Sequence, residues 1–163
     1  MSLAPTDYDF GNASNYFFAT TITCANDEAR AMYVEAYGHM LNYNHEQAIA
    51  CFTQCAELDP TCAMAYWGIA YCLSSSYNWA PGLGSGYDSI QLALANKDGC
   101  TELEIDLIDA LSLRHTKEAR DQMDPTVLNM GNTPELNAAF ATAMKPIYEK
   151  YAGNLDVASI YVE

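Results

Sequence analysis

Residues 48–60 read AIACFTQCAELDP and residues 63–71 read AMAYWGIAY, and these two stretches decide the fold class. Small residues recur where two helix backbones would approach closely, and aromatic residues are placed to fill the gaps between them. Pro60 then ends the first stretch. This order is expected for the second helix of one helical hairpin, followed by the first helix of the next. We therefore predict an all-α protein built of stacked helical hairpins.

Helical periodicity predicts two antiparallel hairpins, at about residues 26–58 and 61–96. Residues 74–86 are rich in serine and glycine, so the second hairpin is expected to carry an inserted loop. In repeat proteins, such loops often bind partners. Four residues of alternating size are expected in the core between the helices: Phe52, Ala56, Trp67 and Ile69.

Capping signals place the ends of the first two helices. Asn26 or Asp27 is suited to cap the first helix. Residues 42–44, Asn-Tyr-Asn, form a turn, and Asn44 and Gln47 have the spacing of a capping box for the second helix.

The second half of the sequence predicts further helices. Thr101 and Glu104 have capping-box spacing, and residues 116–132 are polar and irregular, with room for one short helix. A longer helix is expected from Thr133-Pro134 to about Tyr151, with Pro146 kinking it or ending its regular hydrogen bonding.

The last helix, opened by Asp156, has an apolar face of Val157, Ile160 and Tyr161 and no following helix to cover it. We expect this face either to fold back on the preceding helix or to mediate self-association, and we slightly favour a homo-oligomer formed through this C-terminal helix.

Composition excludes several partners. The chain has 163 residues, with 7 Lys and Arg against 21 Asp and Glu, which gives a formal charge of −14. Binding to phosphate backbones or to anionic membrane surfaces needs clusters of basic residues, which this sequence does not contain. No run approaches the roughly 18 apolar residues of a membrane span. We therefore predict neither nucleic acid nor membrane as a partner.

The region between Arg30 and Lys97 contains no Lys or Arg and only five acidic residues, together with seven tyrosines and both tryptophans. An uncharged aromatic surface is typical of an interface core, so we predict a groove that binds a peptide or partner protein. The alternative is that these tyrosines simply pack between helices. The partner-binding residues predicted for the groove are Asn42, Tyr66, Tyr71, Asn78 and Trp79.

The run from Tyr37 to Trp79 resembles a family of tetratricopeptide-repeat proteins. Its signature combines Asn-His-Glu at residues 44–46, Leu-Asp-Pro at 58–60 and Ala-Met-Ala-Tyr-Trp-Gly-Ile-Ala at 63–70. The resemblance implies tetratricopeptide-like hairpins stacked as a short right-handed α-solenoid, but it names no activity. Because repeat modules of this kind usually bind a partner, we predict a scaffold rather than an enzyme. Residues 1–25 lack helical periodicity, so we interpret them as an irregular N-terminal arm. Because members of the family are typically longer, we interpret residues 26–163 as the N-terminal part of a longer repeat protein.

An alternative function is a metal-binding or enzymatic domain centred on His39, His45 and Glu46, which lie near the turn between two predicted helices. Our leading prediction has no catalytic residue, no metal and no cofactor. No signal peptide is visible, so we expect a cytoplasmic protein unless a targeting segment has been removed. The six cysteines are expected to be free and buried: Cys24, Cys51, Cys55, Cys62, Cys72 and Cys100.

Overall fold

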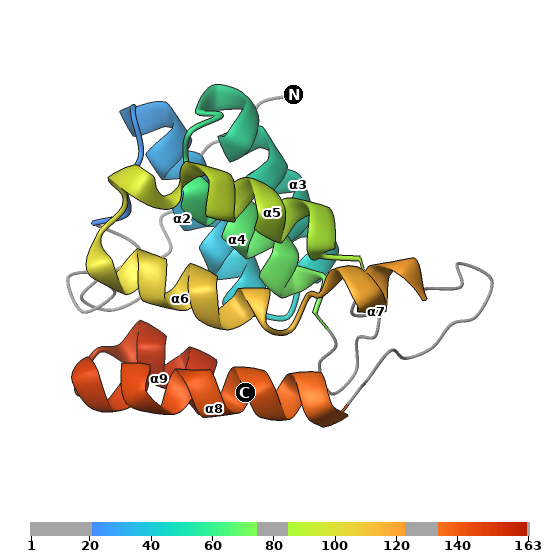
Figure 1. Ribbon diagram of the computed structural model, residues 1–163. Helices are drawn as coiled ribbons and strands as arrows, with labels where there is room; N and C mark the ends of the chain where they lie inside the picture. Colours follow the sequence, from blue (N-terminus) through green and yellow to red (C-terminus); the bar gives the residue numbers. More distant parts are fainter. Residues whose placement is uncertain (1–20, 75–84, 123–133, 163) are drawn as a thin grey trace.

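The computed structural model describes residues 21–74, 85–122 and 134–162, and every regular element within them is a helix. The all-α prediction is therefore confirmed for these residues. No helix in the described ranges is long and apolar enough to cross a membrane. The elements are α2 (Asp27–Leu41), α3 (His45–Leu58), α4 (Ala63–Cys72), α5 (Tyr87–Asn96), the 3₁₀-helix η2 (Lys97–Gly99), α6 (Glu102–Ser112), α7 (Lys117–Asp121), α8 (Pro134–Lys150) and α9 (Leu155–Val162) (Figure 1).

The helices from α2 to α6 each pack against the next one along the chain, and α8 packs against both α6 and α9. Helices α2 and α3 fall within the first predicted hairpin, and α4 and α5 within the second. In Figure 1, α8 and α9 form a layer along the far side of α6 from α5. Of the predicted N-terminal arm, only residues 21–25 are described, and they contain no helix.

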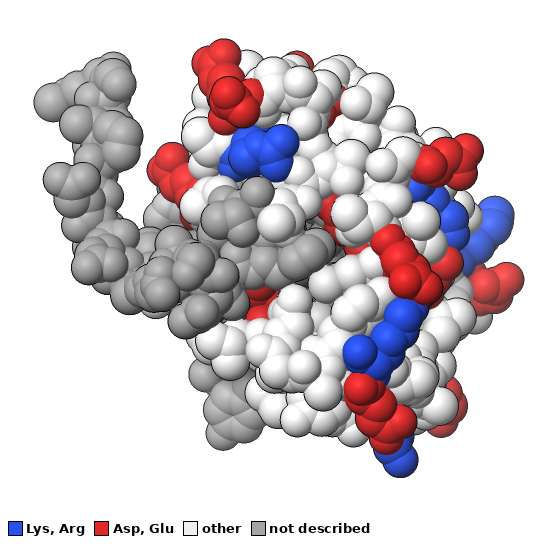
Figure 2. Space-filling model, turned by 90° about the vertical axis from the view of Figure 1, so that its left-hand side faces the viewer, with Lys and Arg blue, Asp and Glu red and all other residues white. Residues whose placement is uncertain are grey.

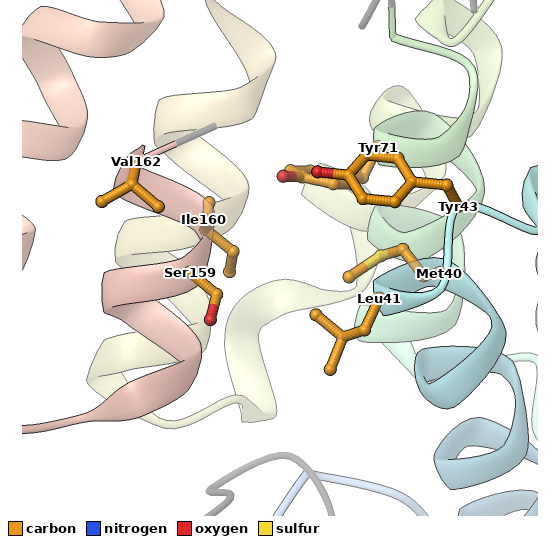
Figure 3. A pocket seen from close by; sticks show the side chains of 7 residues that line it. All are labelled: Met40, Leu41, Tyr43, Tyr71, Ser159, Ile160 and Val162. Atoms are coloured by element: carbon orange, nitrogen blue, oxygen red, sulfur yellow. The ribbon is translucent and has the colours of Figure 1, made fainter. Parts of the chain in front are cut away.

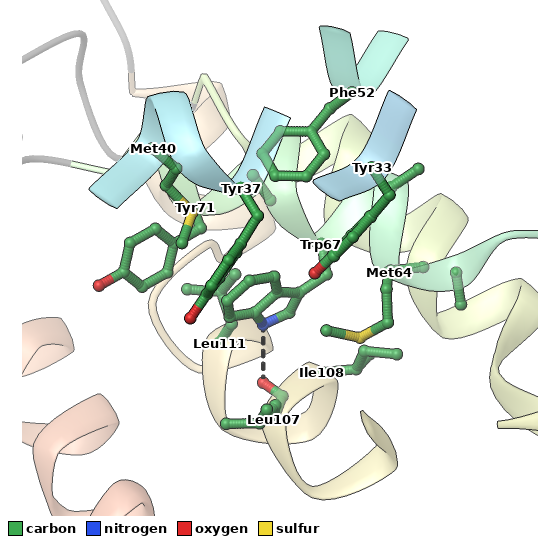
Figure 4. Close-up of a cluster of buried hydrophobic side chains, with 14 of the residues drawn as sticks. Tyr33, Tyr37, Met40, Phe52, Met64, Trp67, Tyr71, Leu107, Ile108 and Leu111 are labelled. Atoms are coloured by element: carbon green, nitrogen blue, oxygen red, sulfur yellow. Dashed lines mark hydrogen bonds between the residues drawn. The ribbon is translucent and has the colours of Figure 1, made fainter. Parts of the chain in front are cut away.

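Trp67 lies at the centre of the core, surrounded by tyrosines of α2 and by side chains of α6 (Figure 4). Its indole N–H donates a hydrogen bond to the Leu107 carbonyl at 3.2 Å, which fixes α4 against α6. The predicted core positions Phe52, Ala56 and Trp67 are buried, as expected. Ile69 is only partly buried and packs at the edge of this core.

Two of the predicted helix caps are confirmed. The Asn26 side chain accepts a hydrogen bond from the Ala29 backbone N–H at 2.9 Å, at the start of α2. At the start of α6, Thr101 and Glu104 form a complete capping box. These side chains satisfy backbone N–H groups that have no partner within the helix.

The capping box predicted for Asn44 and Gln47 is wrong. The Asn44 side chain makes no cap hydrogen bond, although Asn44 does occupy the N-cap position of α3. Its backbone N–H closes the preceding helix by donating to the His39 carbonyl, and its backbone (φ −85°, ψ 62°) is outside the extended region that capping side chains need. The Gln47 amide instead donates to Cys51 Sγ at 3.6 Å.

Pro146 does not end its helix, because α8 continues from Pro134 to Lys150. A proline leaves the carbonyl four residues earlier without its helical N–H donor. Here that carbonyl belongs to Thr142, and both Thr142 and Pro146 are exposed, so water can hydrogen-bond to it.

In the structure the last helix, α9, folds back on the preceding helix, α8, which is the first of the two predicted alternatives. Val157 and Ile160 are buried within the single chain, where α9 packs against α8. Tyr161 is half-buried and stacks on Tyr148 with ring centroids 4.8 Å apart. Fold-back therefore covers two of the three residues of the predicted apolar face, and self-association through the C-terminal helix stays a prediction.

Candidate functional site

A pocket of about 290 Å³ lies where the ends of α2 and α4 meet α9. Figure 3 shows the side chains of α9 facing those of α2, α4 and the turn after α2 across this space. None of the lining residues is charged. They are Met40, Leu41, Tyr43, Tyr71, Ser159, Ile160 and Val162.

The floor and the rim of the pocket differ in exposure. Met40, Tyr71 and Ile160 are buried and form the apolar floor. At the rim, Leu41 is 40% exposed, Tyr43 64% and Val162 81%. Large exposed apolar side chains that cluster around a cavity are typical of a binding site rather than of ordinary protein surface.

The turn after α2 holds Tyr43 in an unusual backbone conformation. Its φ is 58°, the only positive value for a non-glycine residue in the described ranges. The N–H groups of Tyr43 and Asn44 donate to the carbonyls of Met40 and His39, both at 3.0 Å, which is the Schellman pattern of helix termination. Glycine is usual at this position, because a side chain there costs about 1–2 kcal/mol. Backbone strain of this kind clusters at functional sites.

A buried hydrogen bond holds the walls of the pocket together. The Tyr37 hydroxyl of α2 donates to Asp156 Oδ1 of α9 at 2.8 Å. Burial raises the pKa of Tyr37 well above its usual value, and the Asp156 charge acts in the same direction, so the phenol keeps its proton. On the α4 side, the Tyr71 ring stacks on Trp67 with centroids 5.1 Å apart. Both contacts anchor the pocket in the core.

The structure brings only part of the predicted partner-binding set to this pocket. Tyr71 forms part of its floor, and Asn42 lies between two of the rim residues in the sequence. The Asn42 side chain donates to the Gly38 carbonyl of its own helix at 2.8 Å. Asn78 and Trp79 lie outside the described residues.

Tyr66 does not line the pocket. It lies near the start of α4, where its hydroxyl donates to the Pro60 carbonyl at 3.1 Å.

The sequence analysis did not predict the contribution of α9 to the pocket, which consists of Ser159, Ile160 and Val162. The apolar periodicity of this helix was visible in the sequence, but not the helix against which it packs.

The alternative metal-site residues His39, His45 and Glu46 do not form one group of ligands in the described part of the chain. His39 groups with Glu35 and Cys51, whose ligand atoms all lie within 4.8 Å of one another. His45 is buried next to Tyr43, and Glu46 is exposed. Neither His45 nor Glu46 belongs to a group of three potential metal ligands in the described residues.

All six cysteines are free thiols, as predicted, and four of them are buried. Three of the six, Cys24, Cys55 and Cys62, form a second group whose sulfur atoms lie within 4.8 Å of one another. Sequence reasoning did not find this group, because its members come from three separate segments of the chain.

Ser74 and His115 form a buried pair that the sequence did not predict. Ser74 Oγ lies 2.9 Å from His115 Nε2, a geometry that also occurs between a nucleophile and its base. However, the two residues are 3% and 1% exposed, and the serine is also hydrogen-bonded to the Ala70 carbonyl. We therefore interpret the pair as a structural link between the end of α4 and the segment after α6.

None of the ion pairs in the described ranges involves a residue that lines the pocket. Lys150 pairs with Glu102 and Asp106, each at 2.8 Å, between α8 and α6. Lys97 pairs with Asp109 nearby. Figure 2 shows basic side chains next to acidic ones along one side of the molecule, with broad uncharged surface beside them.

Comparisons of the chain with protein-family models, with curated proteins and with solved structures give no match.

Proposed function

We propose that the chain is a helical-repeat scaffold that binds a peptide segment of a partner protein in the pocket between α2, α4 and α9. In this proposal the helix pairs α2–α3 and α4–α5 are tetratricopeptide-like hairpins of a short right-handed α-solenoid. The packing of each helix from α2 to α6 on the next, and the small and aromatic residues between them, support this architecture.

The uncharged lining of the pocket is the observation that carries the proposal. Its volume of about 290 Å³ is just below the range of small-molecule sites, which is about 300–1,000 Å³. A pocket of this size suits a single anchoring side chain, and such anchors supply most of the binding energy in many protein interfaces. The strained Tyr43 and the exposed Leu41 and Val162 would form the rim around that anchor.

The chemistry of the partner follows from the lining and from the net charge. The anchor should be aliphatic or aromatic, because no lining residue offers a charge to pair with. Residues flanking the anchor should be neutral or basic, because the chain carries a charge of −14. The cytoplasmic location expected from the sequence is part of the proposal, and six free thiols are compatible with a reducing compartment.

A peptide-display selection on the whole chain tests this function. Ser159→Phe should fill the pocket from its rim, and Thr142→Phe is the matched control. Both are exposed hydroxyl residues on helices, and both donate to the carbonyl four residues earlier, at 2.9 and 2.7 Å. Only Ser159 lines the pocket.

We expect the selected peptides to share one apolar anchor residue. They should bind the wild type and Thr142→Phe equally, and Ser159→Phe at least about tenfold more weakly, which corresponds to about 1.4 kcal/mol. Peptides that bind Ser159→Phe as well as the wild type would show that the pocket is not the binding site.

A second candidate function is a metal-binding or enzymatic one at Glu35, His39 and Cys51, which the proximity of their ligand atoms favours. One sulfur, one nitrogen and one oxygen ligand would leave a fourth position open, as catalytic zinc sites do. If this function holds, His39→Ala should abolish metal binding at this group and His45→Ala should not. Equal loss in both variants would instead favour the set predicted from the sequence.

A further inference from the structure

Three cysteine thiols converge from three parts of the chain. Cys24 precedes α2, Cys55 lies in the last turn of α3, and Cys62 is the N-cap residue of α4. Their sulfur atoms all lie within 4.8 Å of one another. Cys55 and Cys62 are fully buried, whereas Cys24 is only partly buried.

The backbone on the N-terminal side of Cys24 is held by a buried carboxylate. Thr23 donates to Glu104 through both its backbone N–H and its hydroxyl, each at 2.7 Å. The Arg30 guanidinium also binds the backbone carbonyls of Ile22 and Cys24. Glu104 is itself fully buried and fixed by the capping box of α6, so these contacts anchor the segment to the core.

The backbone on the other side of Cys24 is held by a second buried carboxylate. Asp59 accepts a hydrogen bond from the Ala25 N–H at 2.6 Å, and others from the Thr61 N–H at 3.0 Å and the Thr61 hydroxyl at 2.6 Å. Burial alone would raise the pKa of Asp59, but these hydrogen bonds outweigh it and lower the pKa, so the carboxylate is charged. Cys24 is therefore fixed from both sides, facing the two buried thiols.

We propose that Cys24, Cys55 and Cys62 form a three-thiolate binding site for a soft d¹⁰ metal ion such as Zn²⁺ or Cu⁺. With metal–sulfur bonds of about 2.3 Å, sulfur atoms around one ion are about 3.8 Å apart in tetrahedral geometry and about 4.0 Å apart in trigonal geometry. The observed limit of 4.8 Å is within about 1 Å of these values, so small side-chain rotations complete the site.

Metal binding to this group has to displace protons from the thiols. Burial raises the pKa of the Cys24 thiol to about 12, and Cys62 and Asp59 add to the shift. A hydrogen bond with Cys55 and burial also raise the pKa of Cys62. Without a metal Cys24 and Cys62 therefore keep their protons, and a bound cation favours their thiolate forms. Binding of one ion forms three metal–sulfur bonds and releases three protons to solvent.

Cadmium titration of the whole chain tests the proposal. Cd²⁺ serves as the probe, because its bonds to thiolates give an ultraviolet charge-transfer band, and the protein is kept reduced with a phosphine. Each of the three cysteines is changed to alanine in turn. The controls are Cys72→Ala, a buried thiol outside the group, and Cys51→Ala, which removes a ligand of the group with His39.

We expect one Cd²⁺ per chain at this site, displaced by Zn²⁺ or Cu⁺ in competition. Both controls should retain the band, and Cys24→Ala should lower the affinity more than about 100-fold, because even changes outside the first ligands cost about 10–100-fold. Cys24 is the least buried of the three, so this variant should fold even if Cys55→Ala and Cys62→Ala do not, and circular dichroism verifies its folding.

Three results would overturn the site. The first is the absence of a band in the reduced wild type. The second is a band that Cys24→Ala leaves unchanged or that Cys51→Ala removes. The third is a disulfide between two of the three cysteines in the protein as purified, because two thiols would then be unavailable for the metal.

Discussion

The hydroxyl of Tyr37 donates a buried hydrogen bond to the carboxylate of Asp156 at 2.8 Å, across 119 positions of the sequence. This bond joins α2 to α9, the two helices that form opposite walls of the pocket. The pocket therefore depends on a contact between the first and last described helices of the chain.

Removal of the Tyr37 hydroxyl should destabilise the fold. Tyr37→Phe leaves a buried carboxylate with one hydrogen bond fewer, which costs about 1–3 kcal/mol. Urea unfolding of the purified chain measures this change. Tyr148→Phe is the control, since Tyr148 is 39% exposed and should change the free energy of unfolding by less than about 0.5 kcal/mol. Equal effects of the two changes would contradict the importance of the contact.

Stability should fall at alkaline pH. Burial raises the pKa values of Tyr33 and Tyr37 well above the ordinary value of 10.0, with further contributions from Cys62 and Asp156 respectively. The contribution of these phenols to stability is therefore fully present below pH 10 and is lost as the pH rises toward their folded pKa values. Phenolate absorbance should show both tyrosines ionising only on unfolding.

The cysteines make a separate contribution to this pH dependence, which Tyr37→Phe can distinguish from that of the tyrosine. Burial raises the pKa of Cys24 and of Cys100 from 9.0 to about 12, so stability should begin to fall above pH 9. Tyr37→Phe should retain this thiol-dependent part and lose less stability than the wild type above pH 10. Ionisation of every tyrosine near pH 10 in the folded protein would contradict the burial of these phenols.

Local features of the fold were predictable because their signals lie within a few residues. Asn26 and the pair of Thr101 and Glu104 mark the starts of α2 and α6, since each caps backbone groups only two or three positions away. The cap at Asn44 failed because the Schellman turn at Tyr43 determines the backbone there, and a tyrosine gives no sequence signal for a left-handed conformation.

The site could be predicted only in part, because its residues meet through long-range packing. The uncharged aromatic region drew attention to Tyr71, which lines the pocket, but the pocket is also lined by Ile160 of α9. Likewise, Cys55 and Cys62 are near in sequence, whereas Cys24 lies beside them because its neighbours are hydrogen-bonded to distant carboxylates. Ala25 donates to Asp59, and Thr23 donates to Glu104. One sequence contains no signal for such contacts.

The contact between Phe52 and Gly68 should show strong coupling. A Cβ atom at Gly68 would lie 2.5 Å from Phe52 Cζ, so Gly68→Ala should cost about 1–3 kcal/mol despite the better helix propensity of alanine. Phe52→Ala alone should cost about 3–5 kcal/mol. In the Phe52→Ala background, Gly68→Ala should become neutral or stabilising by up to about 1 kcal/mol. Additive losses in this double-mutant cycle would contradict the close approach.

Metal affinity at the three-thiolate site should increase with pH. Because raised pKa values keep Cys24 and Cys62 protonated near neutral pH, protons compete with the metal for the sulfur atoms. The apparent affinity for Cd²⁺ should therefore rise as the pH is raised from about 6 to about 8, with proton release measurable in weakly buffered solution. Affinity that does not depend on pH would mean that the thiols are not the ligands.

The strained turn at Tyr43 should separate stability from binding. Tyr43→Gly removes the side chain from a left-handed position, where a non-glycine residue costs about 1–2 kcal/mol. Part of this gain is offset by the greater freedom of glycine in the unfolded chain and by the lost edge contact with His45. We expect a free energy of unfolding that is unchanged or higher by up to about 1 kcal/mol.

Peptide affinity of Tyr43→Gly should nevertheless fall, because the tyrosine ring forms part of the pocket rim. Tyr43→Asn keeps a residue that tolerates the left-handed region but lacks the ring, so it should also weaken binding. If both variants bind selected peptides as tightly as the wild type, Tyr43 has no role in recognition and its strain needs another explanation.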